Sequence, residues 1–106
     1  MGIATQFAAL ADDTRCALVD LLRDGPRPVH ELAAAFSVSR PAISRHLRLL
    51  KEAGLVVEHR RGRENFYSLD RRRLKALSAW LELYWGQRIK VLAGPIEPNP
   101  QQELDV

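Results

Sequence analysis

The 106-residue sequence predicts a mainly α-helical α+β domain, with about five helices and a two-stranded β-hairpin between the last two helices. Apolar residues recur at helical spacing through most of the chain, between residues that cap or end helices. From Leu55 to Leu69 the pattern changes to two β-prone runs around a glycine. The length of the chain and its hydrophobic content of 46% are typical of a single domain. We place it at residues 1–93, followed by a flexible, proline-rich tail at 94–106.

The first two helices are predicted from apolar spacing and one cap. A short N-terminal helix is indicated by the helical spacing of Ile3, Phe7 and Leu10. Asp12 stands at an N-cap position, where its carboxylate can accept the backbone NH groups of Thr14 and Arg15. The second helix has one apolar face, formed by Leu18, Leu21 and Leu22. We expect it to stop at Gly25-Pro26.

The third and fourth helices are separated by a tight turn, Ser37-Val38. Pro28 suits the first position of the third helix, because that position needs no NH donor. The buried stripe of this helix consists of Leu32, Ala33 and Phe36. Ser39 caps the fourth helix, which Gly54 ends. Its inner side carries Ile43, Leu47 and Leu50.

Two strands and a long helix complete the predicted domain. The strands are Leu55-Val56-Val57 and 66–69, joined by a charged segment that contains Gly62. Asp70 caps the last helix, in which apolar residues recur near a heptad spacing from Leu74 to Leu92. A short third helix, a tight turn and a longer fourth helix make a helix-turn-helix, and the hairpin that follows makes it a winged one.

Basic charge is concentrated in one segment. Residues 40–63 hold seven basic and two acidic side chains, a net +5, so the rest of the chain carries −2 of the total of +3. This distribution is typical of a nucleic-acid-binding surface. The alternative is a solvated face of a helix and a hairpin.

The fourth helix is predicted to be the recognition helix of a DNA-binding protein. A rotation of about 100° per residue places its polar and basic side chains outward. Arg40 and Arg45 are candidates for bidentate contact with guanine, and Ser44 for contact with several bases. Arg48 and Lys51 lie further along the helix and are expected to contact DNA phosphates. The expected surface also includes Ser39, Pro41 and His46, the last as a partly buried packing or phosphate-bonding histidine rather than a metal ligand.

The chain resembles the ArsR/SmtB family of bacterial transcriptional repressors. The resemblance rests on FAALADDTRCALVDLL, VHELAAAFSVSRPAISRHLRLLKEAGLV and GRENFYSL, which together cover most of positions 7–69. It implies that the wing arginines, Arg60, Arg61 and Arg63, lie against the flanking backbone or minor groove; a solvated turn is the alternative. It also implies a homodimer and therefore a roughly palindromic double-stranded operator, with half-sites about one helical turn, or a multiple of it, apart.

The last helix is more apolar than a lone small domain needs, so part of its surface is expected to pack on a second copy. In the resembling family the first and last helices form the dimer interface. Its expected residues are Ile3, Phe7, Leu77, Trp80, Leu81, Tyr84, Trp85 and Arg88.

The inducing signal is not predicted. Founding members of the family sense metals through a cysteine pair in the third helix or through aspartate and histidine on the last helix, but here the third helix offers only His30-Glu31 and the stretch 70–92 has no histidine. We therefore expect no metal and no cofactor. Cys16 is expected to be a small buried filler, with oxidation as the alternative. A small organic ligand near the last helix's aromatic residues, or no ligand at all, also stays open.

Other classes of function are disfavoured. No nucleophile-base pair, catalytic carboxylate pair or phosphate loop indicates an enzyme. A winged helix that binds only proteins would carry acidic or apolar residues on the face where Arg40, Ser44 and Arg45 stand. The single cysteine, the absence of a leader and the short apolar runs predict a cytoplasmic protein without a membrane partner.

Overall fold

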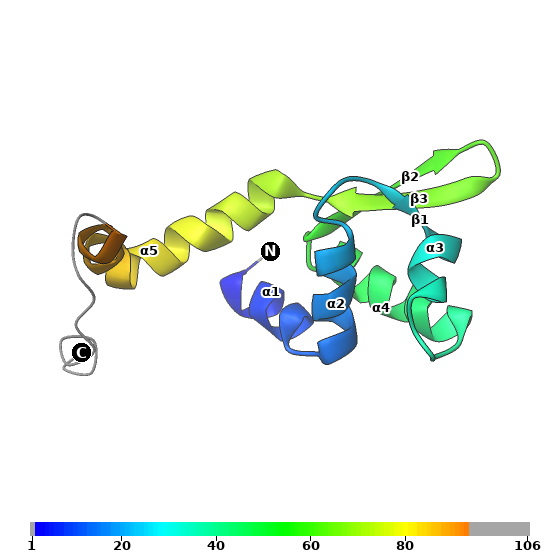
Figure 1. Cartoon of the computed structure of the whole chain (residues 1–106), viewed down its shortest axis with the longest axis horizontal. Helices are drawn as coiled ribbons and strands as arrows, with labels where there is room; N and C mark the ends of the chain where they lie inside the picture. Colours follow the sequence, from blue (N-terminus) through cyan, green and yellow to red (C-terminus); the bar gives the residue numbers. More distant parts are fainter. Residues whose placement is uncertain (1, 94–106) are drawn as a thin grey trace. The chain divides into compact units, whose positions relative to one another are not determined.

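The computed structural model describes the backbone of residues 2–93 and the side chains of residues 2–84. Within that range the predicted winged helix-turn-helix is confirmed (Figure 1). The predicted tail at 94–106 lies outside the described residues. The elements are α1 Ile3–Leu10, α2 Asp13–Leu21, β1 Arg27–Pro28, α3 Val29–Ala34, α4 Arg40–Glu52, β2 Val56–Arg61, β3 Glu64–Leu69 and α5 Arg71–Ala93. Two compact units divide between Lys75 and Ala76.

The predicted helix caps are present at three helix starts. Asp12 Oδ2 accepts the backbone NH of Arg15 at 3.0 Å. Ser39 Oγ accepts the backbone NH of Ala42 at 3.3 Å, and Asp70 Oδ1 accepts that of Arg73 at 3.2 Å. Each bond satisfies one of the donors that a helix start leaves without an intrahelical partner. The starts of α2, α4 and α5 are thereby fixed by residues of the sequence next to them.

The core of the first unit is built on the predicted inner faces of α2 and α4. Its largest fully buried side chains are Leu18, Leu22, Leu32, Ile43, Leu47, Leu50, Leu55 and Val56. Burying one such side chain stabilises the fold by about 1.5–3 kcal/mol. The prediction was wrong for Ala33 and Phe36, which are half-buried, because α3 ends at Ala34 and only Leu32 and Val29 face inward. The buried amide of Gln6 in α1 was not predicted.

Two predicted helix boundaries need correction. Pro28 is the N-cap of α3 and not its first residue, because its extended backbone pairs with Phe66 as an edge strand, where no NH is required. The second helix ends at Leu21 and not at Gly25, since residues 22–24 form a turn. The end of α4 agrees with prediction: Gly54 has φ +81°, and the NH groups of Gly54 and Leu55 bond to the carbonyls of Lys51 and Leu50 as a Schellman motif.

The sheet has the strand order β1-β3-β2, with both pairings antiparallel. The strand β1 is two residues long and was not predicted, because so short a segment has no alternating pattern. The hairpin strands extend further than predicted, with Arg61 opposite Glu64 across a two-residue turn. Gly62 has φ +62° at the first turn position, as in a type II′ turn. Arg60 and Arg61 therefore lie in β2, and Arg63 lies in the turn.

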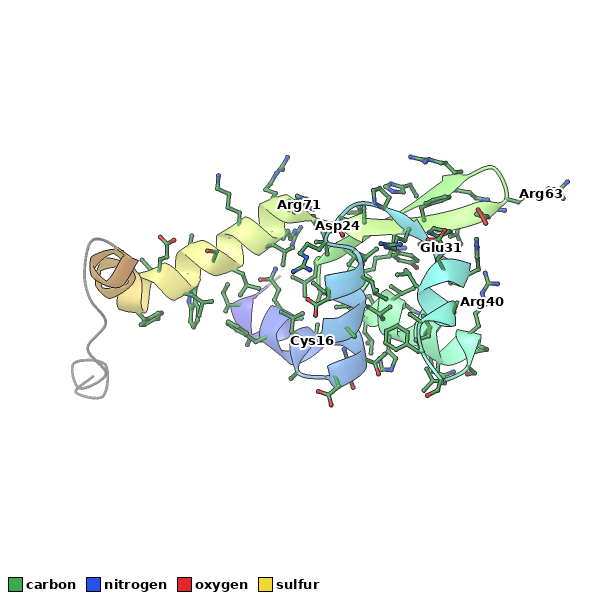
Figure 2. The ribbon with its side chains drawn as sticks, in the orientation of Figure 1. Cys16, Asp24, Glu31, Arg40, Arg63 and Arg71 are labelled. Carbon is green, nitrogen blue, oxygen red and sulfur yellow. The ribbon has the colours of Figure 1, made fainter. Side chains whose placement is uncertain are left out.

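Cys16 is a further correction, because its side chain is exposed on α2 (labelled in Figure 2). It stands two positions before Leu18, a rotation of about 200° that carries it away from the buried face. Its Sγ donates to the Leu10 carbonyl at 2.9 Å.

The second unit contains most of α5. Leu77 is buried there, and the Trp80 and Tyr84 rings pack with their centroids 5.0 Å apart. Leu83 and Tyr84 are 76% and 67% exposed. Within the described residues, α5 included, no helix is long and apolar enough to cross a membrane.

Candidate nucleic-acid interface

The outward side of α4 presents the predicted recognition surface. Pro41 stands in the first turn, where a missing NH costs nothing, and the fully buried Ile43, Leu47 and Leu50 fix the rotation of the helix. The exposed residues of the predicted set are Ser39, Arg40, Pro41, Arg45, Arg48 and Lys51. Ser44 and His46 are half-buried at the two flanks of this side. That these residues contact DNA stays a prediction.

Four arginines of the predicted surface have neither a hydrogen bond nor an ion pair to any described residue: Arg40, Arg45, Arg48 and Arg63. The other two predicted wing arginines are engaged. Arg60 Nε donates to the Gly62 carbonyl at 3.3 Å, and the Arg61 guanidinium lies 4.9 Å from the Phe66 ring centroid. The unpaired guanidiniums leave positive charge without a neutralising partner, which is what a polyanion binds.

An open polar depression of about 430 Å³ lies where α3, α4 and the wing meet. Figure 2 shows Arg40 and Arg63 on the same edge of the molecule. The lining residues are Val29, His30, Arg40, Ser44, Arg63, Glu64 and Asn65. Two guanidiniums, a hydroxyl and an amide can all donate to phosphate oxygens, while Glu64 is paired with His30 Nδ1 at 3.0 Å.

Sequence reasoning missed His30, Glu64 and Asn65 as neighbours of the recognition helix. They come from α3 and β3, which the fold brings beside the start of α4. A signal for Glu64 was available in the hairpin, because a two-residue turn after Arg61 places Glu64 opposite it. His30 and Asn65 carry no comparable signal in the sequence.

A polar network joins the last turn of α4 to the wing. Lys51 Nζ lies 2.8 Å from Glu58 Oε1, and Glu58 also accepts from the Tyr67 hydroxyl. The hydrogen bond from Lys51 lowers the pKa of Glu58. Burial, reinforced by the negative charge of Glu58, raises the pKa of Tyr67 to about 12. Glu58 thus offsets the charge of Lys51, whose predicted contact with phosphate stays a prediction.

A second polar cluster joins α4 to α2. The Arg15 guanidinium donates from Nε to the Ala9 carbonyl at 2.6 Å and lies with Nη1 3.1 Å from Nδ1 of His46. Asp12 Oδ2 lies 3.8 Å from the same nitrogen. The pKa of Asp12 is lowered, chiefly because its carboxylate accepts the backbone NH of Arg15. Sequence reasoning missed Arg15, whose partner is 31 positions away.

The predicted dimer residues fall on α1 and α5. In α1, Ile3 is half-buried and Phe7 is 37% exposed. In α5, Leu77 is buried, Trp80 and Leu81 are half-buried and Tyr84 is exposed. The side chains of Trp85 and Arg88 lie outside the described residues.

The third helix does not fit the metal site of the founding family members. Among the side chains of residues 2–84, no three histidines, cysteines or carboxylates gather closely enough to hold a metal ion. His30 has one carboxylate partner, Glu64, and zinc in proteins generally takes at least three protein ligands.

Comparison with known proteins is consistent with this geometry. Residues 12–57 match the family model described as bacterial regulatory protein, arsR family. The Mycobacterium tuberculosis HTH-type transcriptional regulator Rv2034 is 48% identical over 74% of this chain and 74% of its own length. The Bacillus subtilis transcriptional repressor SdpR is 37% identical over 71% of this chain and 83% of its own. A homodimeric winged helix-turn-helix DNA-binding domain from Mycobacterium bovis, described as a possible ArsR-family transcriptional regulator, superposes with a TM-score of 0.66 at 28% identity, covering 83% of this chain and 82% of that one.

Proposed function

The chain belongs to the ArsR family of bacterial regulatory proteins, and we propose that it is a cytoplasmic homodimeric transcriptional repressor that binds a double-stranded DNA operator, including one at its own promoter. One observation carries the proposal: Arg40, Arg45, Arg48 and Arg63, on α4 and the wing, make no hydrogen bond or ion pair with any described residue. Arginines without a carboxylate are free to replace the counterions of DNA.

In the proposed complex α4 enters the major groove. Arg40 and Arg45 bond guanine edges and Ser44 a neighbouring base, because the first turns of a recognition helix reach deepest. Ser39 and Pro41 border the same groove. Phosphates are bound by His46, Arg48 and Lys51. Arg60, Arg61 and Arg63 follow the backbone or the minor groove that flanks the site.

The proposed dimer uses α1 and α5. The Mycobacterium bovis neighbour is described as homodimeric, and in this chain Leu83 and Tyr84 expose apolar surface on α5. A two-fold dimer presents two recognition helices related by the same axis, so its operator is an inverted repeat. Repression follows if the operator overlaps a promoter. The name of the Bacillus subtilis relative supports repression over activation.

The test is binding of the purified full chain to DNA from upstream of its own gene, followed by fluorescence anisotropy and then footprinting. A protected inverted repeat, bound at least about 10³-fold more tightly than unrelated DNA of equal length, is expected. The matched control is Arg72→Ala, which removes an exposed arginine outside the proposed interface and should leave affinity unchanged. Equal affinity for all sequences would contradict an operator, and no DNA binding would favour a protein-interaction module.

A further inference from the structure

The cluster of Asp12, Arg15 and His46 constrains the chemistry of the recognition helix. Nη1 of Arg15 lies 3.1 Å from Nδ1 of His46, at hydrogen-bond distance. A guanidinium is always protonated and has only donors. The nitrogen that faces it must therefore accept, which requires Nδ1 to be unprotonated. A neutral imidazole with a bare Nδ1 carries its proton on Nε2.

The other ring nitrogen of His46 is left available. None of the described residues hydrogen-bonds to Nε2, and no side-chain nitrogen or oxygen among them is both buried and unsatisfied. Nε2 is therefore accessible from solvent, although the His46 side chain is only 26% exposed. In an imidazole ring the two nitrogens point in diverging directions, so a ring held at Nδ1 by α2 presents its Nε2–H away from α2.

His46 lies next to Arg45 on the outward side of α4, at the flank that faces α2. On the proposed function, this flank borders the groove into which α4 fits, and a DNA backbone passes there. An N–H donor at that place bonds a phosphate oxygen.

We propose that Arg15 is a positioning residue for DNA binding: its guanidinium holds the His46 ring in the Nε2–H form, so that Nε2 donates to a backbone phosphate. The inference rests on the proposed function. Asp12 favours the opposite ring form, because its carboxylate oxygen lies 3.8 Å from the same Nδ1 and can only accept. Without Arg15, Asp12 would draw the proton to Nδ1 and leave Nε2 as an acceptor, which a phosphate oxygen cannot satisfy.

The first experiment needs no DNA. Long-range proton–nitrogen NMR spectra of the ¹⁵N-labelled full chain, recorded at alkaline pH, report which ring nitrogen of His46 carries the proton. The wild type should show the Nε2–H form, and so should the matched control Arg72→Ala. Arg15→Met should shift His46 toward the Nδ1–H form. A wild type in the Nδ1–H form, or an unchanged ring in Arg15→Met, would overturn the proposal whatever the DNA affinity.

The second experiment is a double-mutant cycle on operator affinity. Arg15→Met should weaken binding about tenfold, the effect of losing a hydrogen bond to a charged acceptor. His46→Gln places an amide donor near the position of Nε2 without any need for a tautomer. It should bind more tightly than His46→Ala, which has no donor at that place. Adding Arg15→Met to His46→Gln should cost less than about twofold, even though the bond to the Ala9 carbonyl is lost in both backgrounds.

The outcomes distinguish the positioning role of Arg15 from the proposed repressor function. Equal losses in both backgrounds would mean that Arg15 acts through packing and would overturn the positioning role while the repressor proposal stands. A His46→Gln variant that binds no more tightly than His46→Ala would overturn the donor role of Nε2. A wild-type chain that binds no DNA would overturn both proposals.

Discussion

At the scale of single residues, the partner of each basic side chain decides what it can offer to DNA. Lys51 forms an ion pair with Glu58, and the Arg61 guanidinium lies over the Phe66 ring. Arg40 and Arg45 have no such partner among the described residues, and their guanidiniums can take the two-bond geometry that guanine presents. We therefore propose base readout for these two arginines and, for the paired residues, contacts with phosphates, which need less precise placement.

Arg45→Ala should cost about 1–3 kcal/mol on the operator and relax preference at one base position, because one bidentate contact is lost. The measurement is anisotropy with a set of operators, each substituted at one position. Arg72→Ala, an exposed arginine with no described partner, serves as the control for the loss of charge. If Arg45→Ala weakens binding equally on every operator, Arg45 contacts phosphate and not a base.

Residue roles were predictable from the sequence where they depend on near neighbours. Asp12, Ser39 and Asp70 cap helices through bonds to residues three positions away, and all three caps are present. Cys16 was wrongly predicted to be buried. The prediction identified the apolar face of the second helix but did not ask whether Cys16 lies on that face. The contact of Arg15 with His46 joins two helices and depends on their packing, which no local pattern specifies.

At the scale of elements, the wing divides its arginines between strand and turn. Arg60 and Arg61 end β2, while Arg63 occupies the second turn position after Gly62. The hairpin pattern predicted two strands and the turn glycine. It did not predict the lengths of the strands, because both strands continue through charged residues that have low strand preference on their own. Only the completed ladder, with Arg61 opposite Glu64, defines where the strands end.

Replacing Arg60, Arg61 and Arg63 together by Ala should flatten the dependence of log affinity on log salt concentration. Each phosphate contact contributes about 0.9 to the slope, so up to about 2.7 per protomer should be lost. A matched variant with Arg23, Arg72 and Lys75 replaced by Ala removes the same charge from exposed positions outside the interface and should leave the slope near that of wild type. An unchanged slope in the wing variant would show that the wing does not touch phosphates.

The network between α4 and the wing predicts alkaline instability. The phenol of Tyr67 has a pKa raised to about 12 by burial and by Glu58, whereas an unfolded tyrosine ionises near its ordinary value of 10. Between these two pH values the unfolded chain releases a proton that the folded chain keeps, so the free energy of unfolding falls as pH rises. Tyr67→Phe should reduce this fall in denaturant titrations.

The same network can be followed directly by tyrosinate absorbance, since the chain has two tyrosines. The step near pH 12 should disappear in Tyr67→Phe and persist in the matched variant Tyr84→Phe, which removes an exposed ring. Loss of that step in Tyr84→Phe instead would mean that Tyr67 is not the protected phenol.

At the scale of the whole molecule, the sequence predicted the order of the five helices and the two hairpin strands, because each of them carries its own pattern; only the two-residue β1 was missed. It also predicted an excess of apolar surface on α5, and the exposed Leu83 and Tyr84 agree with that. The pattern of one chain does not specify how a second copy covers this surface. That contact is therefore described only as part of the proposed dimer. The proposed inverted repeat depends on the same interface, since one protomer reads one half-site.

Tyr84→Glu should therefore weaken both dimer and operator binding. A buried aromatic anchor typically contributes about 2 kcal/mol or more, so the dimer dissociation constant should rise roughly 30-fold, with an added cost for burying a carboxylate on each protomer. Light scattering over a dilution series measures the mass, and anisotropy the affinity. The control is Ala79→Glu, an exposed position about 140° around α5 from Tyr84, which adds the same charge and should leave both unchanged. If Tyr84→Glu remains dimeric at every concentration, this part of α5 lies outside the interface, and the dimer must be built on other residues.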